Sequence, residues 1–70
     1  MGELQKQLQE LRKEKGITQA AAGKDLGLSR STIAGYETKG REPGIDMLIR
    51  LADYYNVTID YLVGRTDKRK

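Results

Sequence analysis

Apolar residues recur along this chain with the three- and four-residue spacing of helices. In the N-terminal segment, Leu4, Leu8 and Leu11 fall on one helical face. Basic residues follow them, and Gly16 then breaks the pattern, as glycine often does at the end of a helix. No segment shows a convincing strand pattern, so the chain is predicted to be all-α. The predicted helices cover residues 2–15, 19–26, 30–38 and 45–55, with a short fifth helix between Thr58 and Gly64.

Local signals mark the ends of these helices. Thr18, Ser29 and Thr58 each precede a predicted helix and carry a hydroxyl that can accept a hydrogen bond from its first turn. Gly27 is expected to end the second helix in a left-handed conformation. The polar residues 65–70 are expected to fray. In the fourth helix a core-facing stripe is predicted at Ile45, Leu48, Leu51, Ala52 and Tyr55.

The second and third predicted helices are rich in alanine and glycine, residues that bury little surface. Gly23 lies one helical turn before Gly27. Two helices joined by a short turn must approach closely where they cross, and a large side chain there would force them apart. Gly23 is therefore predicted to permit a tight helix–turn–helix. The side chains expected to pack around the crossing are Leu26, Leu28, Ile33 and Tyr36.

These features occur in an order that resembles a known family. Three segments carry the likeness: LRKEKGITQ, GKDLGLSRSTIAGYE and GREPGIDMLIRLADYYNVTIDYLVGRTD. They resemble the Cro/repressor-type (Xre family) helix-turn-helix transcriptional regulators over nearly the whole chain. The resemblance implies a compact five-helix, lambda-repressor-like DNA-binding domain over residues 1–64, followed by a polar tail over residues 65–70. It also implies a homodimer on operator DNA, with the third helix in the major groove.

The resemblance assigns roles to residues around the turn. Base contacts are expected from the start of the third helix, at Arg30, Ser31 and Thr32. Phosphate contacts are expected from Gln19, Ser29, Thr38, Lys39 and Arg41. Arginine can donate two hydrogen bonds to guanine, the commonest specific base contact. Each role has a plainer alternative: an arginine on an exposed helix face, hydroxyls that only cap a helix, or a solvated loop.

Departures from the family pattern affect how DNA would be read. Gly35 stands where the family often has a longer polar side chain, so the reading of sequence is expected to be shorter or shifted. Lys39 and Gly40 stand in the reverse of the usual order, which leaves the roles of Thr38 and Lys39 open. For the homodimer, a contact patch is predicted at Tyr61, Leu62 and Val63.

Composition narrows the possible functions. The 70 residues are enough for one domain, and they include no cysteine and no histidine. Disulfides, the usual zinc ligands and the usual general base are therefore missing. Asp25, Asp46, Asp53 and Asp60 are spread over three predicted helices with no evident convergence, so neither catalysis nor a metal or other cofactor is expected. The formal charge of +3 is compatible with a polyanionic partner but is weak support alone.

No apolar run is long enough to cross a membrane, and the charged N-terminus lacks the apolar centre of a signal peptide. A cytoplasmic protein is therefore expected. The leading hypothesis is a sequence-specific repressor whose partner is a double-stranded DNA operator. The alternative is an antitoxin or another protein-interaction module with the same fold, whose partner would be a toxin or an anti-repressor. The two hypotheses are not exclusive.

Overall fold

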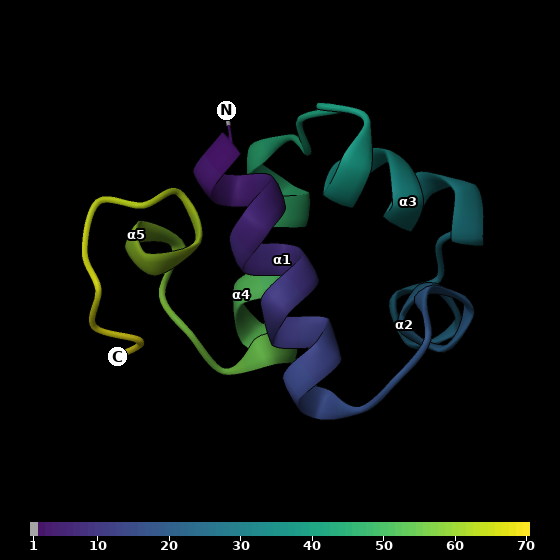
Figure 1. Ribbon diagram of the computed structural model, residues 1–70, viewed down its shortest axis with the longest axis horizontal. Coiled ribbons are helices and arrows are strands. Elements are labelled where there is room, and N and C mark those ends of the chain that lie inside the picture. The colour runs from purple at the N-terminus through teal and green to yellow at the C-terminus, as the bar shows by residue number, and fades with distance from the viewer. Residues whose placement is uncertain (1) are drawn as a thin grey trace.

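The computed structural model describes residues 2–70, and within them the chain forms helices joined by short loops, with no strand. The helices are α1 (Gly2–Lys15), α2 (Gln19–Leu26), α3 (Arg30–Thr38), α4 (Ile45–Tyr55) and α5 (Ile59–Leu62). Helix α1 crosses the middle of the molecule, with α2 and α3 to one side and α5 to the other (Figure 1). The predicted all-α fold is confirmed, and the first four helices have the predicted bounds.

The core is built mainly from leucines and is centred on α1. Leu4, Leu8 and Leu11 are all buried, so each successive turn of α1 contributes one side chain, as its spacing predicted. The other helices and the segment before α5 close around this row. Their contributions are Leu26, Ile33, Leu51, Ala52, Val57, Tyr61 and Leu62.

Side-chain caps begin three of the helices. The hydroxyls of Thr18, Ser29 and Thr58 each accept a hydrogen bond from the backbone N–H three residues further on, at 3.0–3.1 Å. Gly27 ends α2 with φ +72°, in the left-handed region where a residue with a β-carbon is strained. The predicted caps and the predicted helix end are confirmed.

One residue of the predicted core stripe in α4, Ile45, lies outside the core. Ile45 is 63% exposed, and Ile49, one turn later, is 45% exposed. A helical side chain covers the turn that precedes its own Cα, and the first residue of a helix has no such turn. Ile45 opens α4, so its apolar side chain lies at the surface although the spacing placed it in the core.

The C-terminal segment was expected to fray, but it returns against the body. The backbone N–H of Thr58 donates to the carbonyl of Arg69 at 2.9 Å. The Arg69 guanidinium donates two hydrogen bonds of 2.7 Å to the Glu14 carboxylate and one of 3.3 Å to the Tyr61 hydroxyl. The hydrogen bond from Arg69 lowers the pKa of Glu14. None of the helices described within residues 2–70 is both long and apolar enough to cross a membrane.

Candidate nucleic-acid interface

Helices α2 and α3 meet at a turn that leaves no space for a side chain. The backbone N–H of Leu28 donates to the Gly23 carbonyl at 2.7 Å. A β-carbon added to Gly23 would lie 2.6 Å from the backbone oxygen of Leu28 and 3.3 Å from the backbone of Ser29. These contacts are with backbone atoms, which cannot rotate away. The predicted role of Gly23 at the crossing is therefore confirmed.

The turn holds α3 along one side of the molecule with one face turned outward (Figure 1). Ile33 and Glu37 point inward and are 3% and 5% exposed. Arg30, Ser31 and Thr38 are exposed. The outward face is therefore polar or basic, and it starts at the N-terminus of the helix, where backbone N–H groups attract negative charge.

The single acidic residue of α3 is removed from this outward face. The single N–H of Arg12 Nε is shared by the two carboxylate oxygens of Glu37, at 2.8 and 3.1 Å, and the Glu37 side chain is 2% exposed. Arg12 also donates from Nη1 to the Ile17 carbonyl at 2.8 Å. The hydrogen bond with Glu37 raises the pKa of Arg12. The pair ties α1 to α3 and neutralises the one carboxylate that α3 could have turned toward a phosphate backbone.

The residues predicted to contact bases differ in their surroundings. Arg30 and Ser31 are exposed. Thr32 is half-buried, and its hydroxyl lies 2.9 Å from the hydroxyl of Ser29. Ser29 also accepts from the Thr32 backbone N–H, so its hydroxyl acts as the cap of α3. Arg30 and Ser31 are thus the better placed of the predicted base-reading residues.

The residues predicted to contact phosphate are also unequal. Gln19 is half-buried, and its side-chain amide donates to Glu37 at 3.3 Å. The Gln19 amide, for which a phosphate contact was predicted, thus extends the buried Arg12–Glu37 pair. Thr38 is exposed, and its hydroxyl donates to the Ala34 carbonyl at 2.8 Å.

The loop after α3 brings two further cations to the same side. Lys39 and Arg41 are both exposed, and their backbone N–H groups both donate to the Gly35 carbonyl at 3.1 Å. Gly35 itself is buried, beneath the Arg41 side chain. The sequence indicated only that residue 35 lacks a side chain, and no local signal pairs Gly35 with Arg41.

The predicted dimer patch needs correction. Leu62 is 0% exposed and Tyr61 is 8% exposed, and both belong to the core. The apolar pattern of α5 was interpreted as a contact surface for a second copy. This four-residue helix instead packs its apolar side against the small core of its own chain. Val63 is half-buried.

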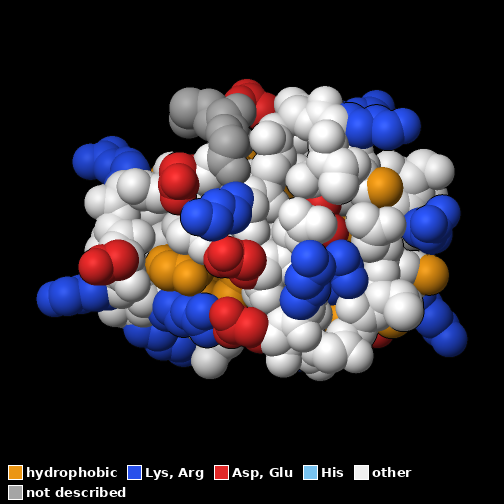
Figure 2. Space-filling view, in the orientation of Figure 1, with side chains coloured by type: hydrophobic (Ala, Val, Ile, Leu, Met, Phe, Trp, Pro, Cys, Tyr) orange, Lys and Arg blue, Asp and Glu red, His pale blue; other side chains and the backbone are white. Residues whose placement is uncertain are grey.

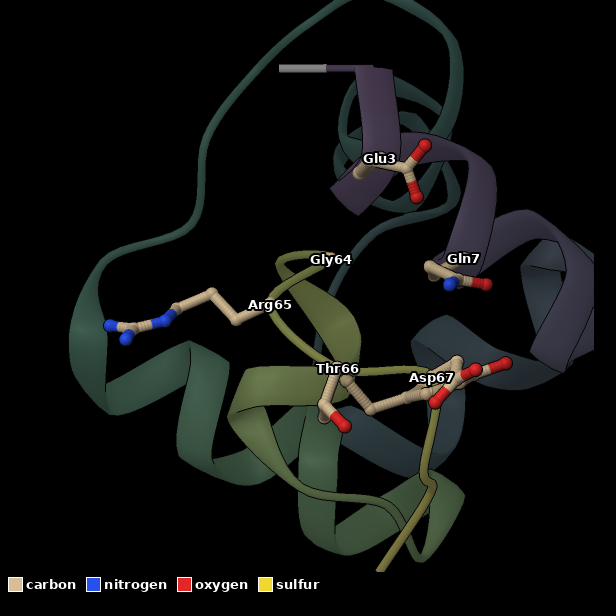
Figure 3. Close-up of a pocket in the computed structure, with 7 residues that line it drawn as sticks. Glu3, Gln7, Gly64, Arg65, Thr66 and Asp67 are labelled. Atoms are coloured by element: carbon tan, nitrogen blue, oxygen red, sulfur yellow. The ribbon is translucent and has the colours of Figure 1, made fainter.

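Charge is unevenly distributed over the surface. In the face shown in Figure 2, Lys and Arg side chains line the edge over α2 and α3, and over α1 and the C-terminal segment Lys and Arg side chains are interspersed with Asp and Glu side chains. A hollow between α1 and that segment has the carboxylates of Glu3 and Asp67 in its lining, together with Gln7 and Thr66 (Figure 3). Arg65, also at its edge, points away from these side chains. In this view, carboxylates accompany the cations over α1 and the C-terminal segment, whereas the edge over α2 and α3 carries mainly cations.

Comparisons with known proteins agree with this geometry. A family model described as helix-turn-helix matches residues 8–62. The chain is 37% identical over 67 residues to the HTH-type transcriptional regulator ImmR of Bacillus subtilis (strain 168), covering 96% of this chain and 53% of that protein. It is 40% identical over 63 residues to the HTH-type transcriptional regulator AnsR of the same organism, covering 90% of this chain and 54% of that protein.

The chain belongs to the Cro/repressor-type (Xre) helix-turn-helix family. It is a helix-turn-helix domain of the transcriptional-regulator type, with α2 and α3 as the two helices of the motif. The chain spans about half the length of the curated relatives that it matches.

Proposed function

We propose that this chain binds double-stranded DNA by placing α3 in the major groove. Arg30 and Ser31, at the exposed start of α3, would contact base edges. Lys39 and Arg41, in the loop that follows, would lie near the phosphates and fix the orientation of the domain. The observation that carries the proposal is the outward face of α3, which is polar and basic because its one carboxylate is buried against Arg12.

The biological role proposed is sequence-specific repression of transcription in the cytoplasm. The relatives are named transcriptional regulators, which supports regulation as the outcome of binding. A homodimer would read two half-sites about one helical turn apart, roughly 34 Å. With Tyr61 and Leu62 in the core, the contact between copies must use other residues.

The test is selection of bound sites from random double-stranded DNA, followed by affinity measurements on the selected site and on random DNA. Arg30→Ala is expected to weaken binding to the selected site by about tenfold or more, and binding to random DNA much less, because a bidentate base contact is lost. The matched control is Arg65→Ala, which removes an exposed cation from the C-terminal segment. Equal loss on both DNAs with Arg30→Ala would reduce Arg30 to a phosphate contact, and failure to select any sequence would refute the proposal.

A further inference from the structure

The surface of α3 one turn after Ser31 is occupied by a side chain from the following loop. Gly35 lies four residues after Ser31 and therefore on the same side of the helix. A β-carbon built on Gly35 would meet three carbons of the Arg41 stem, with Cδ at 3.1 Å, Cβ at 3.6 Å and Cγ at 4.0 Å. The Arg41 stem thus runs along α3 where a side chain of residue 35 would otherwise begin.

The backbone fixes this arrangement. The Gly35 carbonyl accepts hydrogen bonds from the N–H groups of both Lys39 and Arg41. Two bonds to one carbonyl turn the loop sharply back over the C-terminal half of α3. Arg41 remains exposed overall, and within residues 2–70 its guanidinium has no hydrogen-bond or ion-pair partner. The stem is held against the helix while the charged end is left available.

We propose that Arg41 is a base-reading residue, which takes the place on α3 that Gly35 leaves empty. It would donate hydrogen bonds to a base edge, with guanine as the best-matched acceptor because its N7 and O6 fit the arginine fork. This inference rests on the proposed DNA-binding function and changes the part that Arg41 plays in it. Arg41 would discriminate between bases at one base pair of each half-site, whereas an ordinary loop cation would contact only phosphate.

The experiment compares the sequence preferences of variants across a complete set of single base-pair changes in the selected site. Arg41→Ala removes the whole side chain. Arg41→Met removes the guanidinium but keeps an unbranched stem to pack on Gly35, so a change in folding does not confuse the result. Lys39→Ala is the matched control, because it removes one exposed cation from the same loop. Thermal melts of each variant confirm that the domain is folded.

Both Arg41 variants are expected to lose discrimination at one base pair by about tenfold or more, and to keep the preferences that depend on Arg30. Lys39→Ala should weaken all sequences alike. If both Arg41 variants weaken all sequences alike as well, Arg41 is only a phosphate contact and the inference fails while the proposed function stands. If the unmodified chain selects no sequence, the proposed function itself fails, and this inference with it.

Discussion

Gly23, which has no side chain, is the residue that permits the close approach of α2 and α3. Gly23→Ala adds one methyl group 2.6 Å from the Leu28 backbone oxygen, so the crossing of α2 and α3 must open. The free energy of unfolding is expected to fall by about 2 kcal/mol, because overpacking against backbone outweighs the better helix propensity of alanine. Urea denaturation measures it.

The control for this substitution is Lys24→Ala, at the next position of the same helix. Lys24 is exposed, so its removal should change the free energy of unfolding by less than about 0.5 kcal/mol. A Gly23→Ala variant as stable as the unmodified chain would mean that the turn is looser than the contact with Leu28 indicates.

At the level of elements, the buried Arg12–Glu37 pair joins α1 to α3. Glu37→Ala would leave the Arg12 guanidinium without its carboxylate, although that side chain is only 12% exposed. Removing one member of a buried ion pair is strongly destabilising, and the expected loss in the free energy of unfolding is about 3 kcal/mol. Chemical denaturation of the variant at neutral pH tests the value.

The Glu14–Arg69 pair is the natural comparison, since its side chains are 52% and 47% exposed. Glu14→Ala should change the free energy of unfolding much less than Glu37→Ala, because water screens an exposed pair. Similar effects of the two substitutions would contradict the assigned role of burial.

A second link between elements depends on pH. The Tyr54 hydroxyl of α4 donates to Asp25 of α2 at 2.6 Å. Burial is the main cause that raises the pKa of Tyr54, and the hydrogen bond with Asp25 raises it further. Burial also raises the pKa of Tyr55, to about 12. Both hydroxyls therefore hold their protons more tightly when folded, so their contribution is full below pH about 10 and is lost as pH rises toward 12.

The free energy of unfolding should accordingly decrease above pH about 10. The double variant Tyr54→Phe/Tyr55→Phe should show a shallower decrease, because lysine titration is common to both proteins and only the tyrosines differ. Urea titrations between pH 8 and 11.5 supply the comparison. Parallel pH profiles for the two proteins would show that these tyrosines do not couple folding to pH.

The sequence was sufficient to predict those features that depend on residues close together along the chain. Thr18, Ser29 and Thr58 cap helices through bonds that span three residues, so their pattern alone located the helix starts. It could not locate the Arg12–Glu37 pair, whose members are 25 residues apart, or the Arg69–Glu14 pair, which are 55 apart. Such pairs depend on how the helices pack against one another, and the spacing of residues along the chain does not reveal this packing.

The candidate site divides in the same way. The exposed positions of Arg30 and Ser31 follow from the helix start and its period, and both are local. The burial of Tyr61 and Leu62 was missed because an apolar stripe on a short helix has the same pattern whether it faces a core or a partner. The Arg41 stem over Gly35 was missed because it depends on the path of the loop.

For the molecule as a whole, the placement of charge matters more than its sum. A formal charge of +3 is small, and cations lie on both sides of the molecule. Over α1 and the C-terminal segment they are interspersed with carboxylates, such as those of the hollow, whereas the edge over α2 and α3 carries mainly cations. Only cations that meet phosphates release counterions on binding. DNA affinity should therefore depend on salt through the cations of the α3 side.

The logarithm of the association constant should fall linearly with the logarithm of salt concentration, by about 0.9 for each phosphate neutralised. Lys39→Ala should reduce that slope by about 0.9, because Lys39 lies in the loop next to α3. Arg65→Ala removes the same charge from the C-terminal segment and should leave the slope unchanged. Fluorescence anisotropy on one duplex at several salt concentrations separates the two. Equal reductions would mean that DNA meets the molecule over a wider surface than α3 and its loop, and the orientation proposed for the domain would have to be abandoned.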